Sequence, residues 1–224
     1  MIHFAHRGLS SIYPENTLLS FEKALELDFD GIEFDVTKLT CGTIVVFHDY
    51  NTDRLLNDDY CINDLSYEQL KRIGTKSGEI VPTLEEVLDL IGNKKTINIE
   101  IVTNGIYKDV AKIVNKKIKE GLDKTNIIIS SFYHNEVKKI KDLVHGIKTA
   151  VLMEAVPCNF SRPAIDANAD FLNLSYEFIT KEIVMDAHNR GLKVFVYTVD
   201  KKRDYLKMKR LGVDGFFSNY FSLK

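Results

Sequence analysis

The chain has 224 residues, which is short for a single α/β barrel but long enough to bury a sizeable core. Hydrophobic residues make up 45% of the sequence and charged residues 28%, which is ordinary for a globular protein. The net charge of −2 gives no basic surface for nucleic acid, and no apolar run is long enough to span a membrane.

Short apolar strands alternate with amphipathic helices along the whole chain, a pattern typical of βα units around a parallel sheet. We predict strands at Ile2–His6, Gly31–Val36, Thr96–Ile101, Ile127–Ser131, Thr149–Met153, Phe171–Ser175, Val194–Thr198 and Gly215–Ser218. Eight such strands indicate a TIM (β/α)₈ barrel. We expect one domain over residues 1–224, with an insertion at about 37–82.

The helix after residue 83 illustrates the helical pattern. Its apolar side chains recur at i, i+3, i+4 and i+7, and they are Leu84, Val87, Leu88 and Ile91. Thr83 and Glu86 form a capping box at its start, and Gly92 can end it.

A further apolar segment, Ile44–His48, would make a ninth strand. The linker Thr37–Thr43 is too short for a right-handed crossover, which needs about ten or more residues. Gly42 permits a tight turn, so we predict an antiparallel hairpin of Val36–Leu39 with Ile44–His48. The returning strand would bring His48 and Asp49 to the top of the second barrel strand. The fold of residues 50–82 stays open at this stage.

The second predicted strand carries two acids, Glu33 and Asp35, on one face, about 7 Å apart along the backbone. Inside a barrel such carboxylates would repel each other, at a cost of several kcal/mol. A divalent cation removes the repulsion, and hard oxygen ligands favour Ca²⁺ or Mg²⁺ over zinc. Glu100, near the end of the next barrel strand, is the natural third ligand.

Two histidines end neighbouring segments, His6 after the first strand and His48 after the hairpin. Histidine titrates near neutrality, so the pair is suited to move protons as base and acid. Arg7 can fork onto phosphate oxygens. His3 has the opposite parity to His6 and should face the helices. Glu15, before a helix start, is a candidate for holding Arg7 or His6.

With these residues the chain resembles the glycerophosphodiester phosphodiesterase family of phosphatidylinositol-phospholipase-C-like barrels. The likeness runs from Ile2 to about Asn219. It is carried by His6-Arg7-Gly8, Pro14-Glu15-Asn16-Thr17, Glu33-Phe34-Asp35, His48-Asp49, Asn98-Ile99-Glu100-Ile101, Ser130-Ser131-Phe132, Val196-Tyr197-Thr198-Val199 and Gly212-Val213-Asp214-Gly215-Phe216.

The resemblance implies metal-dependent hydrolysis of glycerophosphocholine, glycerophosphoethanolamine and similar small molecules to glycerol 3-phosphate and an alcohol. It assigns the metal, Ca²⁺ or Mg²⁺, to Glu33, Asp35 and Glu100. His6 and His48 become the acid–base pair, and Arg7 and Tyr197 bind substrate.

Five positions depart from the family pattern. The family usually carries a lysine two residues after the third metal ligand, where this chain has Val102. Losing that charge is expected to cost a few kcal/mol in the transition state. Tyr197 stands where a tryptophan is common. Ser218-Asn219 replaces Thr-Asp, and Cys41 replaces a turn aspartate.

Two other functions stay open. A lyase of the sphingomyelinase D type would stop at a cyclic phosphate, and a non-catalytic barrel would only bind ligand, as Val102 hints. The three cysteines, Cys41, Cys61 and Cys158, match no zinc or disulfide pattern. Met1 leads into the first strand without a signal peptide, so we expect a cytoplasmic protein with no stable membrane association and no nucleic-acid partner. The oligomeric state is open.

Overall fold

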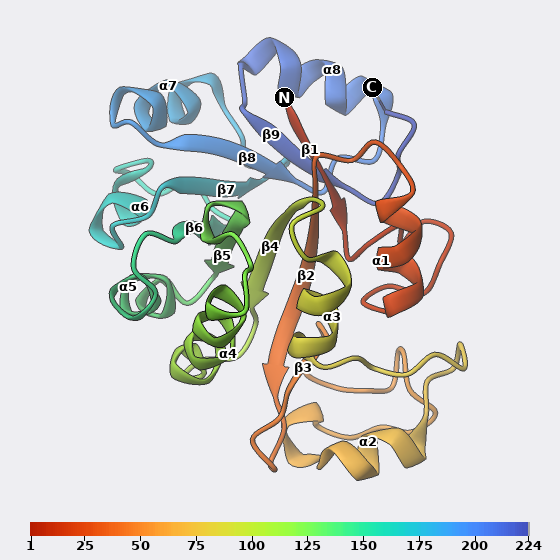
Figure 1. Cartoon of the computed structure of the whole chain (residues 1–224). Helices are drawn as coiled ribbons and strands as arrows, with labels where there is room; N and C mark the ends of the chain where they lie inside the picture. The colour runs from red at the N-terminus through yellow and green to blue at the C-terminus, as the bar shows by residue number, and fades with distance from the viewer. Residues whose placement is uncertain (224) are drawn as a thin grey trace.

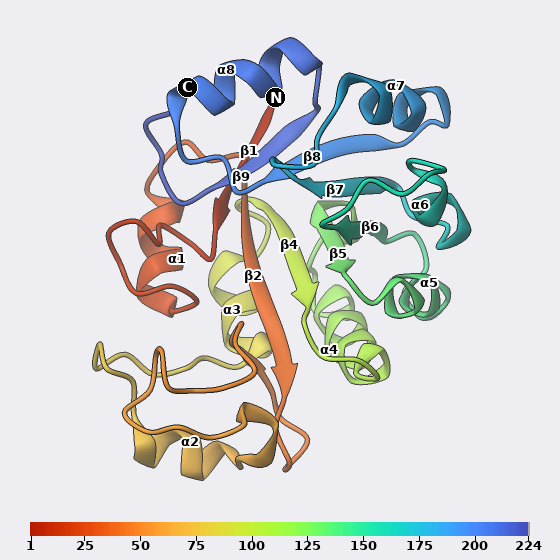
Figure 2. The same cartoon turned by 180° about the vertical axis from the view of Figure 1, so that it is seen from behind.

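Eight parallel strands close into a barrel, as the sequence predicts (Figures 1 and 2). The computed structural model describes residues 1–223. The barrel strands are β1 Ile2–His6, β2 Gly31–Lys38, β4 Thr96–Ile101, β5 Ile127–Ser131, β6 Lys148–Met153, β7 Phe171–Ser175, β8 Lys193–Tyr197 and β9 Gly215–Ser218. β1 pairs with both β9 and β2, which closes the barrel. Five predicted strands have the observed bounds. β6 and β8 begin one residue earlier than predicted, β8 also ends one residue earlier, and β2 ends two residues later.

Within residues 1–223, seven α-helices surround the barrel, and one more lies apart from it (Figure 1). The surrounding helices are α1 Leu18–Leu25, α3 Leu84–Ile91, α4 Tyr107–Lys119, α5 His134–Leu143, α6 Arg162–Asp166, α7 Lys181–Asn189 and α8 Lys202–Leu211, with a 3₁₀ turn, η2, at Lys124–Asn126. The predicted capping box of Thr83 with Glu86 is present at α3, and Thr17 caps α1 in the same way with Ser20.

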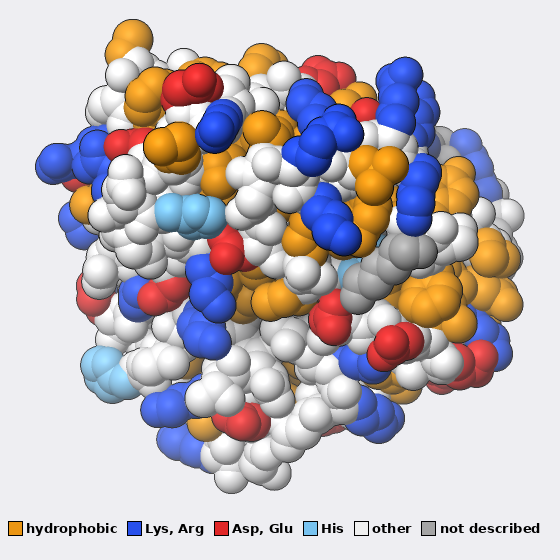
Figure 3. Space-filling model, turned by 90° about the horizontal axis from the view of Figure 1, so that it is seen from above, with side chains coloured by type: hydrophobic (Ala, Val, Ile, Leu, Met, Phe, Trp, Pro, Cys, Tyr) orange, Lys and Arg blue, Asp and Glu red, His pale blue; other side chains and the backbone are white. Residues whose placement is uncertain are grey.

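The molecular surface has mixed charge. On the face shown in Figure 3, Lys and Arg side chains are interspersed with acidic and apolar ones. Within residues 1–223, no helix has the length and apolar character needed to cross a membrane.

Aromatic rings fill the lower part of the barrel interior. Phe4, on β1, packs against Phe217 and Phe195, with ring centroids 5.1 Å and 5.6 Å away. Gly31 faces Phe4, where a Cβ atom would lie 2.3 Å from the Phe4 ring, so a larger residue would displace it. This packed layer closes the barrel from below, and the polar side chains of the next layer lie above it, at the carboxyl ends of the strands.

Alternate residues of β1 face opposite sides of the barrel wall. His3 is fully buried between the barrel and its helices, with its ring stacked on Phe216 at 4.3 Å and tilted against Phe29 at 4.6 Å. His6 has the interior parity of Phe4. The prediction that His3 faces the helices is therefore confirmed.

The predicted hairpin is present and leads into an insertion with its own small core. Strand β3 (Ile44–Val46) runs antiparallel to β2, with Val36 opposite Val46. The insertion then forms a 3₁₀ turn, η1 (Ile62–Asp64), and helix α2 (Tyr67–Ile73). Its core consists of Leu39, Val45, Phe47, Leu56, Ile62, Leu65, Leu70 and Val81. Irregular segments are thus anchored beside the barrel mouth by apolar packing.

Candidate active site

Three carboxylates meet inside the barrel mouth. Glu33 and Asp35 lie on β2 and Glu100 on β4, where Asp35 and Glu100 are directly paired in the sheet. One ligand atom from each lies within 4.8 Å of the others. Glu33 and Asp35 are almost completely buried. Side chains alternate between the two faces of a strand, and the sequence prediction that these three acids lie close together inside the barrel is confirmed.

This acidic cluster carries uncompensated negative charge. Burial, with the neighbouring Asp35, raises the pKa values of Glu33 and Glu100 well above their usual range. In the described residues, Oε1 of Glu33 is buried without a hydrogen-bond partner. A divalent cation would satisfy that oxygen and offset the repulsion, so these donors fit Ca²⁺ or Mg²⁺.

His6 is oriented by the opposite end of the chain. Its Nδ1 lies 2.8 Å from Oδ1 of Asn219, whose Nδ2 donates to Asp200 at 2.6 Å. Ser10 also donates to Oδ1 of Asn219. Because that oxygen can only accept, Nδ1 of His6 carries the proton, and Nε2 faces Glu33 at 4.0 Å. Burial, with the charge of Arg7, lowers the pKa of His6.

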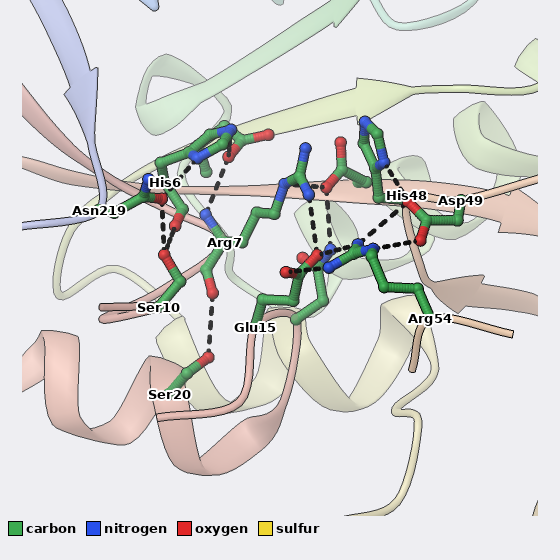
Figure 4. A network of polar contacts seen from close by, with 12 residues as sticks. His6, Arg7, Ser10, Glu15, Ser20, His48, Asp49, Arg54 and Asn219 are labelled. Carbon is green, nitrogen blue, oxygen red and sulfur yellow. Dashed lines mark hydrogen bonds and ion pairs between the residues drawn. The ribbon is translucent and has the colours of Figure 1, made fainter. Parts of the chain in front are cut away.

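His48 follows β3 and lies on the other side of Arg7 from His6 (Figure 4). Its side chain is 39% exposed, compared with 17% for His6. Nδ1 of His48 lies 2.7 Å from Oδ1 of Asp49. The hairpin therefore delivers the second histidine to the mouth of the barrel, where the sequence placed it.

Arg7 joins the two sides of the site. Its backbone N–H donates to Glu33 at 3.0 Å, and its guanidinium lies 2.8 Å from Glu15 and 3.2 Å from Asp35. The predicted contact of Glu15 with Arg7 is present. Burial alone would raise the pKa of Glu15, but hydrogen bonds from Arg54 and Arg7 and their charges lower it to about 2.

Tyr197, the last residue of β8, lines the site. Tyr197 shares a pocket with His6, Glu33 and Glu100. Its hydroxyl donates to the Met153 carbonyl at 3.0 Å, which fixes the ring as a wall. Val102, where the family resemblance led us to expect a lysine, directly follows β4.

Sequence reasoning missed four polar residues that support the site. Asn16 donates to Asp35 at 2.8 Å, Asn219 and Asp200 orient His6, and Arg54 contacts both Glu15 and Asp49. Asn16 has a positive φ of 58°, and asparagine tolerates this backbone better than most residues, a signal its sequence motif contained. Arg54 gives no local signal, because Glu15 lies 39 residues away and the backbone between Asp49 and Arg54 follows no regular pattern.

The arrangement brings an acid cluster that could bind a cation, a guanidinium and two imidazoles together at the barrel mouth (Figure 4). A guanidinium can orient a phosphate, and the imidazoles can exchange protons with oxygens of a bound diester. Such a set of groups supports cleavage of a phosphodiester.

Comparison with known proteins points to the same chemistry. The model of the Glycerophosphoryl diester phosphodiesterase family matches residues 6–223. A glycerophosphodiester phosphodiesterase of Caldanaerobacter subterraneus subsp. tengcongensis is 37% identical over 96% of this chain and 92% of the relative. One from Bacillus altitudinis is 34% identical over 97% of this chain and 94% of the relative.

Solved structures match the whole barrel. An Oleispira antarctica phosphodiesterase in complex with the product sn-glycerol-3-phosphate has a TM-score of 0.89 at 25% identity, covering 98% of this chain and 93% of that one. A glycerophosphodiester phosphodiesterase from Thermotoga maritima has a TM-score of 0.79 at 29% identity, covering 98% and 94%.

Proposed function

Since the chain belongs to the glycerophosphoryl diester phosphodiesterase family, we propose that it hydrolyses glycerophosphocholine, glycerophosphoethanolamine and similar diesters to glycerol 3-phosphate and an alcohol. That it is an enzyme of the phosphodiesterase class follows from relatives that match nearly its whole length. The related Oleispira antarctica enzyme, solved with sn-glycerol-3-phosphate, supports the product.

The observation that carries this function is the placement of the acid cluster beside Arg7, with a histidine on either side (Figure 4). Glu33, Asp35 and Glu100 would hold one divalent cation, either Ca²⁺ or Mg²⁺. The bound ion would supply charge to stabilise an anionic transition state.

The residues of this chain have distinct roles in the proposed reaction. Arg7 orients the phosphate, and Tyr197 forms a wall of the pocket. One histidine, His6 or His48, accepts the proton of the glycerol 2-hydroxyl as that oxygen attacks phosphorus. The other histidine donates a proton to the leaving alcohol oxygen. Water then opens the cyclic phosphate to the phosphomonoester.

Release of glycerol 3-phosphate from glycerophosphocholine and glycerophosphoethanolamine tests this function. The assay is run with Ca²⁺, with Mg²⁺, with chelator and with His6→Ala. We expect release that requires the metal and His6. Phosphorus NMR of the products separates the alternatives: an accumulating cyclic phosphate would identify a lyase, and an unchanged diester would identify a barrel that only binds.

We also propose that the chain works as one domain, since residues of the barrel and of the insertion meet at the mouth. A cytoplasmic location is supported by its three free thiols, Cys41, Cys61 and Cys158, which are typical of a reducing compartment.

A further inference from the structure

Arg54, in the insertion, belongs to the polar network of the site (Figure 4). It lies in a turn between β3 and α2, where the backbone N–H of Leu56 donates to the Thr52 carbonyl at 2.8 Å. Leu56 and Thr52 are both fully buried. The backbone that carries Arg54 is therefore anchored by the core of the insertion, although its side chain is 45% exposed.

The guanidinium of Arg54 is shared between two carboxylates. Nε and Nη2 donate to Asp49 at 2.6 Å and 3.0 Å, while Nη1 and Nη2 each donate to Glu15 at 2.7 Å. Paired bonds of this kind fix direction as well as distance. A lysine has a single ammonium and cannot reproduce both pairs.

On one side, Arg54 acts on His48 through Asp49. Oδ1 of Asp49 accepts from Arg54 and also faces Nδ1 of His48 at 2.7 Å. Because Arg54 fixes the carboxylate of Asp49, that carboxylate can keep accepting a hydrogen bond from Nδ1–H of His48. Nε2 of His48 is then left unprotonated and available for the reaction. His48 has few other constraints, since its side chain is 39% exposed.

On the other side, Arg54 acts on Arg7 through Glu15. Oε1 of Glu15 accepts hydrogen bonds from both arginines, at 2.7 Å from Arg54 and 2.8 Å from Arg7. The remaining oxygen, Oε2, accepts from Arg54 at 2.7 Å. The direction in which Arg7 presents its guanidinium is therefore set partly by Arg54.

Direct phosphate binding by Arg54 does not fit this geometry. A guanidinium has five N–H donors, and the two carboxylates already take four of those of Arg54. Arg54 therefore does not replace the phosphate-facing lysine that the family usually has where this chain has Val102.

Given the hydrolysis proposed above, on which this inference rests, we infer that Arg54 is a positioning residue that ties the insertion to the reaction. It orients His48 through Asp49 and Arg7 through Glu15, so that the proton-transfer group and the phosphate-orienting group keep a fixed relation to each other.

Steady-state kinetics of Arg54→Ala, Arg54→Lys and Arg54→Gln test this role, at saturating divalent cation. Arg72→Gln, which removes an exposed positive charge from α2 in the same insertion, is the matched control. We expect kcat of Arg54→Ala to fall about 100-fold, as for a misplaced catalytic group, with KM nearly unchanged. Arg54→Lys should lose roughly tenfold, and added methylguanidinium should restore part of the activity of Arg54→Ala. Arg72→Gln should match the wild type.

A second readout does not depend on turnover. Nitrogen-15 NMR of the imidazoles should show a slowly exchanging Nδ1–H for His48 in the wild type, lost or shifted in Arg54→Ala while circular dichroism shows the fold intact. A loss confined to KM would overturn the role in favour of phosphate binding. Unchanged kcat with an unchanged His48 signal would overturn it outright. If the wild type releases no glycerol 3-phosphate, the proposed function fails, and the NMR comparison alone decides whether Arg54 positions His48.

Discussion

The barrel and the insertion hold their functional side chains by different means. The barrel places His6, Glu33 and Glu100 on strands that are paired on both sides, where Glu33 is buried and the other two are partly buried. The insertion places His48 and Arg54 on irregular backbone, with side chains 39% and 45% exposed. One half of the site is fixed by sheet geometry and packing, and the other by charged hydrogen bonds.

The difference shows what each half can tolerate. A side chain on a barrel strand keeps its direction as long as the strand stays paired. A side chain on the insertion keeps its direction only while its ionic partners stay in place, since exposed ion pairs are individually weak. Changes to the acid cluster of the barrel should therefore alter cation binding, and changes in the insertion should alter turnover without altering cation binding.

Among changes outside the two histidines, the largest effect should come from the barrel half, in Glu100→Gln. Loss of this ligand should weaken Ca²⁺ or Mg²⁺ binding and lower kcat/KM by about 10³-fold, since a bound metal stabilises the transition state by several kcal/mol. The same change removes a repelling charge, so the metal-free variant should melt at a higher temperature than the wild type. Calorimetric titration checks the affinity, and unchanged affinity would remove Glu100 from the ligand set.

The insertion half should respond differently, as Leu56→Ala would show. Leu56 is fully buried in the core of the insertion, so truncation should lower the free energy of unfolding by about 2–5 kcal/mol. Turnover should fall because Arg54 loses its anchor, while cation affinity stays the same. Leu56→Met, which conserves volume, is the control for denaturation and kinetics. A parallel loss of cation affinity would show that the two halves are not separable.

Val102→Lys, at the edge of the barrel half, should give a smaller effect, which is a gain in turnover. A lysine there would add a cation facing the phosphate, and turnover should rise by up to about tenfold, less than the 10²–10³ often lost with a full oxyanion donor. Val102→Met, which lengthens the side chain without charge, separates charge from size. Slower turnover in the lysine variant would mean that the pocket has adapted to an apolar group.

The smallest effect we expect is the dependence of the free energy of unfolding on pH in the metal-free protein. Glu33 and Glu100 have raised pKa values in the folded chain, so the folded state binds more protons than the unfolded one above pH 4.5. Stability of the chelated protein should therefore fall as pH rises above 4.5 through the raised values, by up to about 1.4 kcal/mol per pH unit for each group. Thermal melts with and without Mg²⁺ check this, and the metal should flatten the slope. Stability that rises with pH in chelator would contradict the electrostatics of the cluster.

Most of the barrel could be predicted from the sequence because its signals are local. Alternation along β2 places Glu33 and Asp35 on one face, and the short linker before Ile44 excludes a crossover. The same parity separates His3 from His6. The predicted bounds differ from the observed ones only at strand ends. For example, β2 runs two residues past its predicted end because it continues into the hairpin.

The supporting contacts could not be predicted, because their partners are distant in sequence. Asn219 meets His6 across the closure of the barrel, and Arg54 meets Glu15 through the fold of residues 50–82. Neither residue lies in a periodic pattern that would indicate its partner. The sequence showed that Asn219 differs from the residue usual in the family, but it did not indicate the hydrogen bond to His6.

The most direct test of the account compares His6→Ala with His48→Ala in one assay of glycerol 3-phosphate release from glycerophosphocholine, at saturating Mg²⁺ or Ca²⁺. If the barrel and the insertion each supply one proton-transfer group, both variants should lose about 10²–10⁴ in kcat while still binding the cation. Full activity in His48→Ala would contradict the account, because the insertion would then contribute no reacting group.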